Sequence, residues 1–408
     1  MPQPSNMSPT ALPSPPLLVL SWPLLLLMAL ATGLAVASNY YVQPLLHSLM
    51  QQFGLSSATA AWLVTTAQFG YALGLLLLVP LGDLFDRRRL IVGMNMLTVG
   101  GLLLIGFAPS GLWLFIGATV TGLCSIGAQI LVPFAASLAP EAQRGRVIGV
   151  LMSGLLLGIL LARTVAGALA GLGDWRLVYW CAAAAMLLIT LVLARRLPTE
   201  PRKPAVRYAD LLQSVWRLFQ QEPLLRLRAF FGAMAFACFS VLWTALAFLL
   251  SSPPYSYGEA LIGLFGLLGV AGVLAANWAG RLNDSGRSNR ATHIFLAVLL
   301  CSWLPLGFAE HSLVALIIGI LLLDLAVQGV HISNQGLLYA IRPESRSRMT
   351  SAYMTSYFAG GALGSLGCGW VYQHSGWSGV VGLGAGFALL AVLVWLAVLG
   401  LQRQQDKS

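Results

Sequence analysis

The sequence predicts an all-α polytopic membrane protein with twelve transmembrane helices arranged as two pseudo-symmetric six-helix bundles. Three observations lead to this fold class. Of 408 residues, 58% are hydrophobic and only 9% are charged, whereas a soluble protein carries about 25% charged residues. The apolar residues are gathered into long runs, and several sequence landmarks recur at half the length of the chain. The composition therefore excludes a soluble enzyme.

Each predicted span rests on its length and its apolar character. A transmembrane helix needs about 20 mostly apolar residues, within a range of about 17–25. The runs that fit are 17–38, 58–80, 90–108, 112–135, 147–171, 177–194, 229–250, 258–279, 292–309, 312–336, 350–372 and 378–400. We expect the first run to stay uncleaved, because no charged residue precedes Asp83 and a signal peptide needs a basic start.

The basic residues predict how the helices are oriented. When the loops are assigned alternately to two faces, all of the 23 Lys and Arg residues except Arg163 and Arg176 fall on one face. The positive-inside rule makes that face cytoplasmic. We therefore predict a multi-pass protein of the inner (plasma) membrane with both termini in the cytoplasm. The net charge of +10 then reflects topology and does not indicate a nucleic-acid partner.

The repeated landmarks divide the chain into two halves. Asp83 and Asp284 lie 201 residues apart, and Trp175 and Trp377 lie 202 apart. Parallel six-helix repeats with a substrate site between them are a known transporter architecture. The predicted units are a disordered tail (1–16), an N-terminal six-helix bundle (17–194), a cytoplasmic linker (195–228), a C-terminal six-helix bundle (229–400) and a C-terminal tail (401–408).

The loop after the second predicted helix carries a family resemblance. It reads Pro-Leu-Gly-Asp-Leu-Phe-Asp-Arg-Arg-Arg at 80–89, and a shorter copy follows at 280–287. The loop resembles the Gly-x-Leu-x-Asp-Arg-x-Gly-Arg-Arg motif of the major facilitator superfamily, and the resemblance covers the chain beyond residue 16. It implies a gating latch of ion pairs at the cytoplasmic face; the alternative is a set of solvated loop charges. The latch residues would be Asp83, Arg87, Arg88, Asp284 and Arg287.

Within this superfamily the chain resembles the twelve-helix drug:proton antiporters, a group of bacterial efflux permeases. The segments 39–44 and 324–335 carry that likeness. The chain departs from the group at two places: Ala118 stands where an Arg is usual, and 162–167 retains only the last glycine of the helix-five signature, with Arg163 in place of Pro. The resemblance implies proton-coupled efflux of a small organic compound.

Ionisable residues within the apolar runs are the strongest candidates for function. An ionisable group in mid-bilayer costs at least about 2.5 kcal/mol and usually faces a cavity or a partner. Asp324 lies near the middle of its span, and Gln328, His331 and Gln335 follow on the same helical face. We predict that Asp324, His331 and Arg163 couple transport to protons. The alternatives are a structural stripe of hydrogen bonds for the Asp324 face, and an anion ligand or a snorkelling side chain for Arg163.

Polar residues on the cavity-lining helices are predicted to contact the substrate. In the resembled fold these are helices one, four, seven and ten. The predicted cavity residues are Asn39, Tyr40, Gln43, Gln129, Gln328, Asn334 and Gln335. Glycines provide small surfaces for close helix contact. The predicted packing glycines are Gly154, Gly158, Gly167, Gly361 and Gly364.

The sequence thus predicts a secondary transporter that works by alternating access. Uptake of a sugar or an organic anion, with Arg163 as anion ligand, is the alternative within transport; a membrane-embedded enzyme is the distant one. No nucleotide-binding motif occurs, and the five cysteines are scattered singly without metal-ligand spacing, so we predict no cofactor and no metal. We expect a monomer whose partners are a small-molecule substrate, protons and the lipid bilayer.

Overall fold

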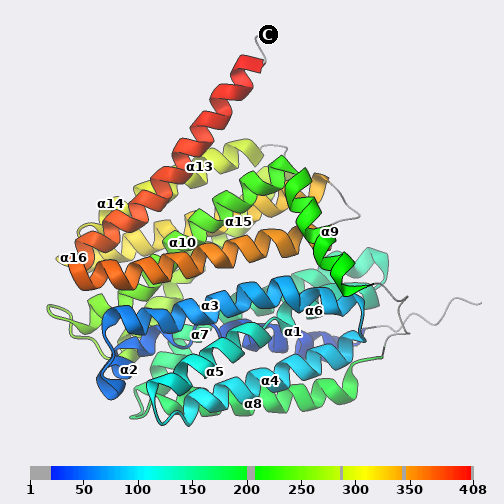
Figure 1. The fold of residues 1–408 in the computed structure, drawn as a ribbon, viewed down its shortest axis with the longest axis horizontal. Helices are drawn as coiled ribbons and strands as arrows, with labels where there is room; N and C mark the ends of the chain where they lie inside the picture. The colour runs from blue at the N-terminus through cyan, green and yellow to red at the C-terminus, as the bar shows by residue number, and fades with distance from the viewer. Residues whose placement is uncertain (1–19, 200–206, 285–287, 342–345, 406–408) are drawn as a thin grey trace, which may run out of the picture.

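The computed structural model describes residues 20–199, 207–284, 288–341 and 346–405. These residues form an all-helical protein (Figure 1), which confirms the predicted class of secondary structure. The predicted tail 1–16 and the last three residues of the predicted tail 401–408 lie outside the described residues.

The helices that precede residue 200 pack against one another and are called here the N-terminal group. Its long helices run alternately in opposite directions and are joined by short 3₁₀ turns at η1 (Gln43–Leu45), η2 (Val79–Asp83) and η3 (Glu141–Gln143). The helices are α1 (Trp22–Ala37), α2 (Leu46–Phe53), α3 (Ser57–Leu77), α4 (Arg87–Gly106), α5 (Gly111–Cys124), α6 (Gly127–Leu138), α7 (Arg144–Ala170) and α8 (Arg176–Arg196).

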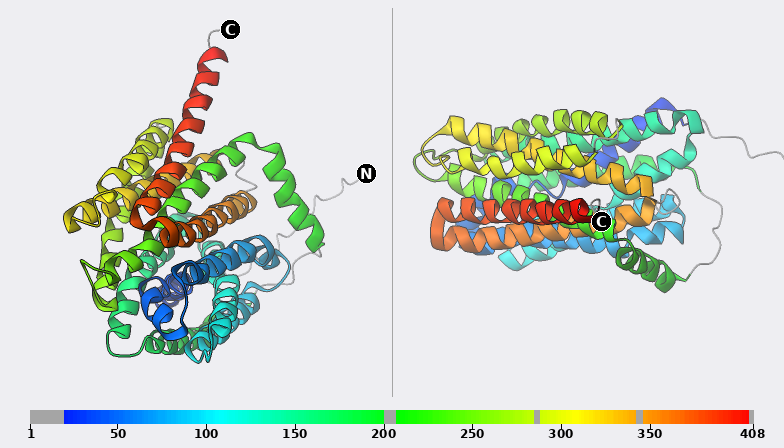
Figure 2. Two further views of the ribbon diagram at one scale, coloured as in Figure 1. Left: turned by 60° about the vertical axis from the view of Figure 1, so that its left-hand side comes forward. Right: turned by 90° about the horizontal axis from the view of Figure 1, so that it is seen from above.

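The helices that follow residue 222 form the C-terminal group, and α9 (Tyr208–Gln221) lies between the two groups in the chain. The members of the C-terminal group are α10 (Pro223–Ser251), α11 (Glu259–Leu264), η4 (Phe265–Gly269), α12 (Val270–Asp284), α13 (Ser288–Cys301), α14 (Trp303–Leu306), α15 (Leu313–Ile341) and α16 (Arg346–Gln405). In Figures 1 and 2 the N-terminal group runs from blue at α1 to green at α8, and the C-terminal group runs from brighter green at α10 to red at α16.

Several predicted spans contain breaks that their apolar composition does not reveal. Within the described residues, nine helical segments are long and apolar enough to cross a membrane, and α1 is a shorter apolar helix. The predicted span 112–135 is divided between α5 and α6, and 292–309 is divided between α13 and α14. The spans 350–372 and 378–400 both lie in α16, which kinks at Gly376 with φ 60° and ψ −150°. Only glycine adopts this conformation readily, and the non-helical backbone at residue 376 divides α16 into two helices.

The two ends of the helix assembly differ in charge. We call the end that carries Arg87–Arg89, Arg144 and Arg196 the basic end, and the end that carries α2 and the turn 252–257 the opposite end. In Figure 1 the basic end is on the right, beside α9, and the opposite end is on the left.

The two groups touch each other from the middle of the assembly towards the opposite end. Gly167 of α7 lies directly on the backbone of Glu259 in α11, and Thr164 donates a hydrogen bond to the Gly263 carbonyl over 3.0 Å. Ser48 of α2 and Glu259 are also hydrogen-bonded. Towards the basic end, a Cβ added at Gly149 of α7 or at Gly280 of α12 would meet nothing within 4 Å. The structure is therefore closed at the opposite end.

A second contact between the groups runs along α3 and the first half of α16, which lie side by side in both ribbon views (Figures 1 and 2). The Thr65 and Ser365 hydroxyls are 2.9 Å apart. Gln68 and Ser240 of α10 exchange hydrogen bonds of 3.0 and 3.1 Å. The Gln68–Ser240 contact is buried and the Thr65–Ser365 contact is partly buried, so they hold the two groups in register.

The five predicted packing glycines all lie where helices come close. Gly154 and Gly158 of α7 face the backbone of α1 at Ala29 and Gly33. Gly167 faces α11 of the other group. Gly361 faces Gln68 and Phe236, and Gly364 faces Ala237 of α10. A side chain at any of these positions would force two helices apart.

We predict that Gly158→Leu destabilises the protein, because the new side chain would occupy the space of the α1 backbone at Gly33. Overpacking of this kind costs about 1–3 kcal/mol, so the thermal unfolding midpoint in detergent should fall by several degrees. Gly149→Leu, on the same helix but with open space around it, is the matched control and should leave the midpoint unchanged. Equal midpoints for the two variants would contradict the close α1–α7 contact.

Candidate functional site

Three buried side chains meet where the two groups are in contact. Arg163 comes from α7 of the N-terminal group, whereas Trp243 of α10 and Asp324 of α15 come from the C-terminal group. Arg163 is 3% exposed and Asp324 is 4% exposed. The Arg163 guanidinium carbon lies 3.8 Å from the centre of the Trp243 ring, and the Trp243 indole nitrogen donates a hydrogen bond of 3.1 Å to Asp324 Oδ1.

The indole of Trp243 thus connects the cation and the carboxylate. Among the described residues, no ion pair of 4.0 Å or less joins Arg163 to Asp324. The face of the indole is attracted to the guanidinium, and its N–H is attracted to the carboxylate. The structure therefore brings the two predicted coupling residues together through an aromatic ring and not by direct contact.

Other side chains complete the surroundings of Arg163. Its guanidinium carbon lies 4.9 Å from the centre of the Tyr40 ring and 5.2 Å from that of Phe239. Arg163 Nε donates a hydrogen bond of 2.5 Å to Gln43 Oε1. The guanidinium is consequently held inside the protein and does not extend towards the bilayer surface. Tyr40 and Gln43, both predicted cavity residues, are brought to this site.

A row of glycines allows the helices to approach at the site. Gly263, Gly266, Gly269 and Gly272 recur at every third residue through α11, η4 and the start of α12. In the 3₁₀ segment η4, residues three apart lie above one another, so these glycines share one face. Gly263 and Gly266 face Arg163, and Gly272 faces Gln328. A Cβ added at Gly269 would lie 3.4 Å from Asp324 Oδ2. We call these four residues the glycine row.

His331 belongs to a different cluster nearer the basic end. It lies seven residues beyond Asp324 on α15, or about 10 Å along the helix. Its Nδ1 is 3.0 Å from the Tyr353 hydroxyl, and its ring centre is 4.8 Å from that of Tyr357. Asn334 donates a hydrogen bond of 3.1 Å to the Arg228 carbonyl in the same cluster. The structure thus separates His331 from Arg163 and Asp324.

Arg228 is a buried charge that the sequence analysis assigned to the cytoplasmic linker. It is 2% exposed in α10, where Nη1 donates to Thr292 over 2.7 Å and Nη2 donates to Asn289 over 3.3 Å. Its guanidinium carbon lies 5.2 Å from the centre of the Trp395 ring. The signal that was missed is the start of α10 at Pro223, because a proline at the first helical position places Arg228 inside the helix.

The remaining predicted cavity residues have diverse surroundings. Gln129 donates a hydrogen bond of 3.4 Å to the Tyr71 hydroxyl, and Gln328 packs on Gly272. Gln335 is half-buried on α15. These side chains lie on helices of both groups, outside the contacts around Arg163.

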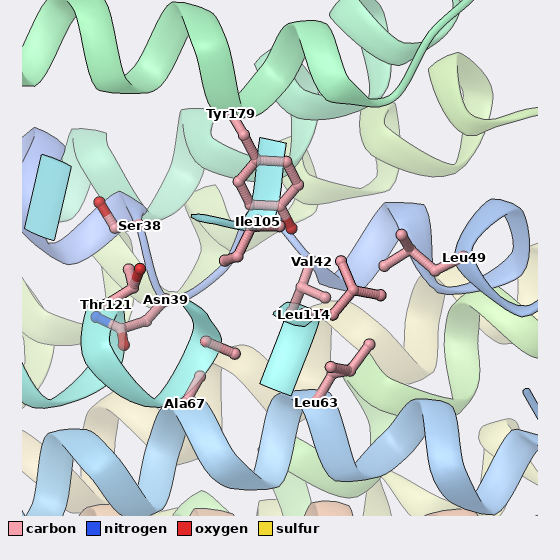
Figure 3. A pocket seen from close by; sticks show the side chains of 11 residues that line it. Ser38, Asn39, Val42, Leu49, Leu63, Ala67, Ile105, Leu114, Thr121 and Tyr179 are labelled. Carbon is pink, nitrogen blue, oxygen red and sulfur yellow. The ribbon is translucent and has the colours of Figure 1, made fainter. Parts of the chain in front are cut away.

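Asn39 faces the interior of the N-terminal group. Its side-chain nitrogen donates a hydrogen bond of 2.8 Å to Ser125 at the break between α5 and α6. Figure 3 shows Asn39 beside Ser38 and Thr121 at a cavity of about 20 Å³ that Tyr179 borders. A cavity of this size has room for about one water molecule and is too small for an organic substrate.

The predicted gating loop forms local contacts at the basic end. Asp83 and Arg87 are 3.8 Å apart, and Arg88 donates a hydrogen bond from its guanidinium to the Ala194 carbonyl. Asp86, which departs from the family motif, caps α4 by accepting a hydrogen bond of 3.1 Å from the Arg88 backbone. In the second copy, Asp284 ends α12 with its side chain outside the description, and Arg287 lies outside the described residues.

Comparisons with known proteins agree with this architecture. Residues 28–341 match the family model of the Major Facilitator Superfamily. The chain is 53% identical over 386 residues to the uncharacterized transporter YgaY of Escherichia coli O157:H7, covering 95% of this chain and 98% of that protein. It is 31% identical over 365 residues to a transporter of Streptomyces coelicolor, covering 89% of this chain and 85% of the relative.

Solved structures show the same fold at low sequence identity. A bacterial homologue of the human lysosomal transporter Spinster, in an inward-facing occupied conformation, superposes with a TM-score of 0.74 at 16% identity, covering 91% of this chain and 94% of that chain. The nucleoside transporter NupG superposes with a TM-score of 0.73 at 12% identity, covering 91% and 98%. The match to the family model and the transporter relatives make the chain a multi-pass membrane transporter and not an enzyme. It belongs to the Major Facilitator Superfamily.

We predict that Arg163 and Asp324 are coupled in stability. Arg163→Gln or Asp324→Asn alone leaves one charge buried without its counterpart, whereas the double variant removes both. The double variant should therefore lose about 1 kcal/mol less than the sum of the single losses, measured as unfolding in detergent. Asp210→Asn with Arg217→Gln, at two exposed positions seven residues apart on α9, is the control cycle and should be additive to within a few tenths of a kcal/mol. Strict additivity at Arg163 and Asp324 would contradict the connection through Trp243.

Proposed function

We propose that this transporter couples proton movement to the export of a small organic compound across the inner membrane, by alternating access between its two groups of helices. One observation carries the proposal: a buried carboxylate, Asp324, is joined through Trp243 to a buried cation, Arg163, that belongs to the other group. A change of charge at Asp324 then acts directly on the contact between the groups. The export direction is supported by the resemblance to drug:proton antiporters.

The proposed coupling follows from the electrostatics of the site. Ionised Asp324 accepts a charge-assisted hydrogen bond from Trp243 and lies in the field of Arg163, so it favours the closed contact at the opposite end. A proton on Asp324 removes the negative charge and weakens both interactions. Protonation would therefore shift the population towards the state that is open at the opposite end.

We further propose that the chain crosses the membrane twelve times. To the nine candidate segments within the described residues we add three crossings: α1, α13 together with α14, and a second crossing in α16. The candidate segment in α16 has 54 residues and is broken at Gly376. The division is that predicted from the sequence, with bundles at 17–194 and 229–400. In the linker, the Tyr208 hydroxyl of α9 donates a hydrogen bond of 2.6 Å to the Leu77 carbonyl at the end of α3.

The proposed orientation places the basic end, with both termini, in the cytoplasm. It is supported by the distribution of Lys and Arg. The state described here would then be inward-facing. Asp83 and Arg87, with Asp284 and Arg287 as their counterparts in the second half, would form the cytoplasmic latch, since the first pair lies at that end.

The proposal assigns the half-buried polar side chains Gln129, Gln328, His331 and Gln335 to the walls of the substrate path. They lie on α6 and α15, one helix from each group, as a site between two rocking halves requires. The chain is proposed to act as a monomer whose partners are its substrate, protons and the surrounding lipid.

We predict that Asp324→Asn abolishes proton-driven transport and leaves downhill exchange of the same compound measurable, because the variant cannot take up or release the proton. The assay uses inverted membrane vesicles with a pH-sensitive dye and a panel of organic compounds screened first on the wild type. Proton-driven accumulation should fall at least about tenfold, to the level of vesicles without the protein. Asp210→Asn, in the exposed first turn of α9, is the control and should transport normally. Full proton-driven accumulation by Asp324→Asn would remove this residue from the mechanism.

A further inference from the structure

Two hydrogen-bond donors at the site have no acceptor. Arg163 Nη2 and Gln43 Nε2 are both fully buried, and neither has a hydrogen-bond partner among the described residues. The two side chains are adjacent, because Arg163 Nε donates a hydrogen bond of 2.5 Å to Gln43 Oε1. A buried donor without an acceptor costs about 1–3 kcal/mol. Two such donors side by side indicate a place built to receive an acceptor that is absent from this state.

The partners of Arg163 divide between the two groups of helices. Tyr40 and Gln43 belong with Arg163 to the N-terminal group, whereas Phe239, Trp243 and Asp324 belong to the C-terminal group. When the groups separate at the opposite end, Arg163 keeps Tyr40 and Gln43 and loses the other three. The guanidinium then faces the opening with its free donor and that of Gln43.

The charge of Arg163 is best compensated by an anion at that moment. Arginine stays protonated at every physiological pH and cannot shed its charge. Its carboxylate neighbour, Asp324, moves away with the C-terminal group and is neutral once it binds a proton. A carboxylate on the ligand can accept from both free donors and forms charge-assisted hydrogen bonds, which are about twice as strong as neutral ones.

We propose that Arg163 and Gln43 bind the carboxylate group of the transported compound, which is therefore an organic anion. This inference rests on the proposed function and specifies its substrate class. The anion replaces Asp324 as the counter-charge of Arg163, and the proton neutralises Asp324. Anion binding at Arg163 and proton binding at Asp324 are consequently linked, because both act on the same contact between the two groups of helices.

The test measures binding without transport. Purified protein at pH 7 and constant ionic strength is titrated with acetate and benzoate. Acetamide and benzamide serve as the neutral isosteres. Each compound is added to about 50 mM, because a ligand of a few atoms binds with a Kd in the millimolar range at best. The thermal unfolding midpoint reports binding, because a ligand of the folded state raises it. We expect at least one carboxylate to raise the midpoint and its amide to leave it unchanged.

Variants locate the binding to the site. Arg163→Gln should weaken the carboxylate effect at least about tenfold, and Gln43→Leu should reduce it while keeping the charge. Arg163→Lys, which retains a cation, should bind at an intermediate level. Arg146→Gln is the matched control, because Arg146 lies on the same helix and its guanidinium carbon is 5.5 Å from the Trp22 ring centre. Its carboxylate binding should equal that of the wild type.

Asp324→Asn separates this inference from the proposed function. Removing the competing carboxylate should leave acetate or benzoate binding at least as strong as in the wild type, even though proton coupling is lost. The anion site would be overturned if the amides raised the midpoint as much as the carboxylates do, or if neither carboxylate raised it. Carboxylate binding that survives Arg163→Gln would also overturn it. If instead Asp324→Asn kept full proton-driven transport while carboxylate binding still required Arg163, the coupling role would fail and the anion site would stand.

Discussion

Burial of Arg163 and Asp324 inside the membrane region is the constraint on which the rest of the structure depends. Each charge costs at least about 2.5 kcal/mol in that environment, so each must be compensated by the protein. Trp243 compensates both, with its ring face towards the cation and its N–H towards the carboxylate. Because Arg163 belongs to one group of helices and the other two residues belong to the other, this compensation exists only when the groups are in contact. The interface is therefore sensitive to the charge state of the site.

The packing around the site serves the same geometry. The glycine row on α11, η4 and α12 leaves room for α7 along its first part and for α15 along its last part. Arg163 is thereby brought over the face of the Trp243 indole and Asp324 to its N–H. The neighbouring contact of Gly167 with Glu259 closes the opposite end. Nearer the basic end, α7 and α12 have open space at Gly149 and Gly280. A rocking motion that reverses this asymmetry would separate the three charged and aromatic residues and would uncover the free donors of Arg163 and Gln43.

Sequence reasoning found the charges and missed what connects them. Asp324 and Arg163 stand out because ionisable residues are rare in apolar runs, and the long apolar runs themselves predict an all-helical membrane protein. Trp243 did not stand out, because a tryptophan in an apolar run has the same appearance whether it faces lipid or a carboxylate. Arg228 was assigned to a loop because hydropathy alone does not locate the start of a helix. The hydrogen bond of Asn39 to Ser125 depends on the break between α5 and α6, which composition does not report. Helix breaks such as Gly376 depend on backbone dihedral angles that composition does not report.

The central claim is that the charge on Asp324 sets the balance between the two states, and a distance across the basic end tests it most directly. Spin labels on cysteines at Gly149 of α7 and Gly280 of α12, in a variant without the five native cysteines, would report that distance by pulsed electron paramagnetic resonance in lipid nanodiscs. The account predicts that acidification shifts the wild type towards shorter distances, as the basic end closes, and that Asp324→Asn shows the short distances already at neutral pH and does not respond to acid. A pH response that is the same in Asp324→Asn and in the wild type would contradict the account.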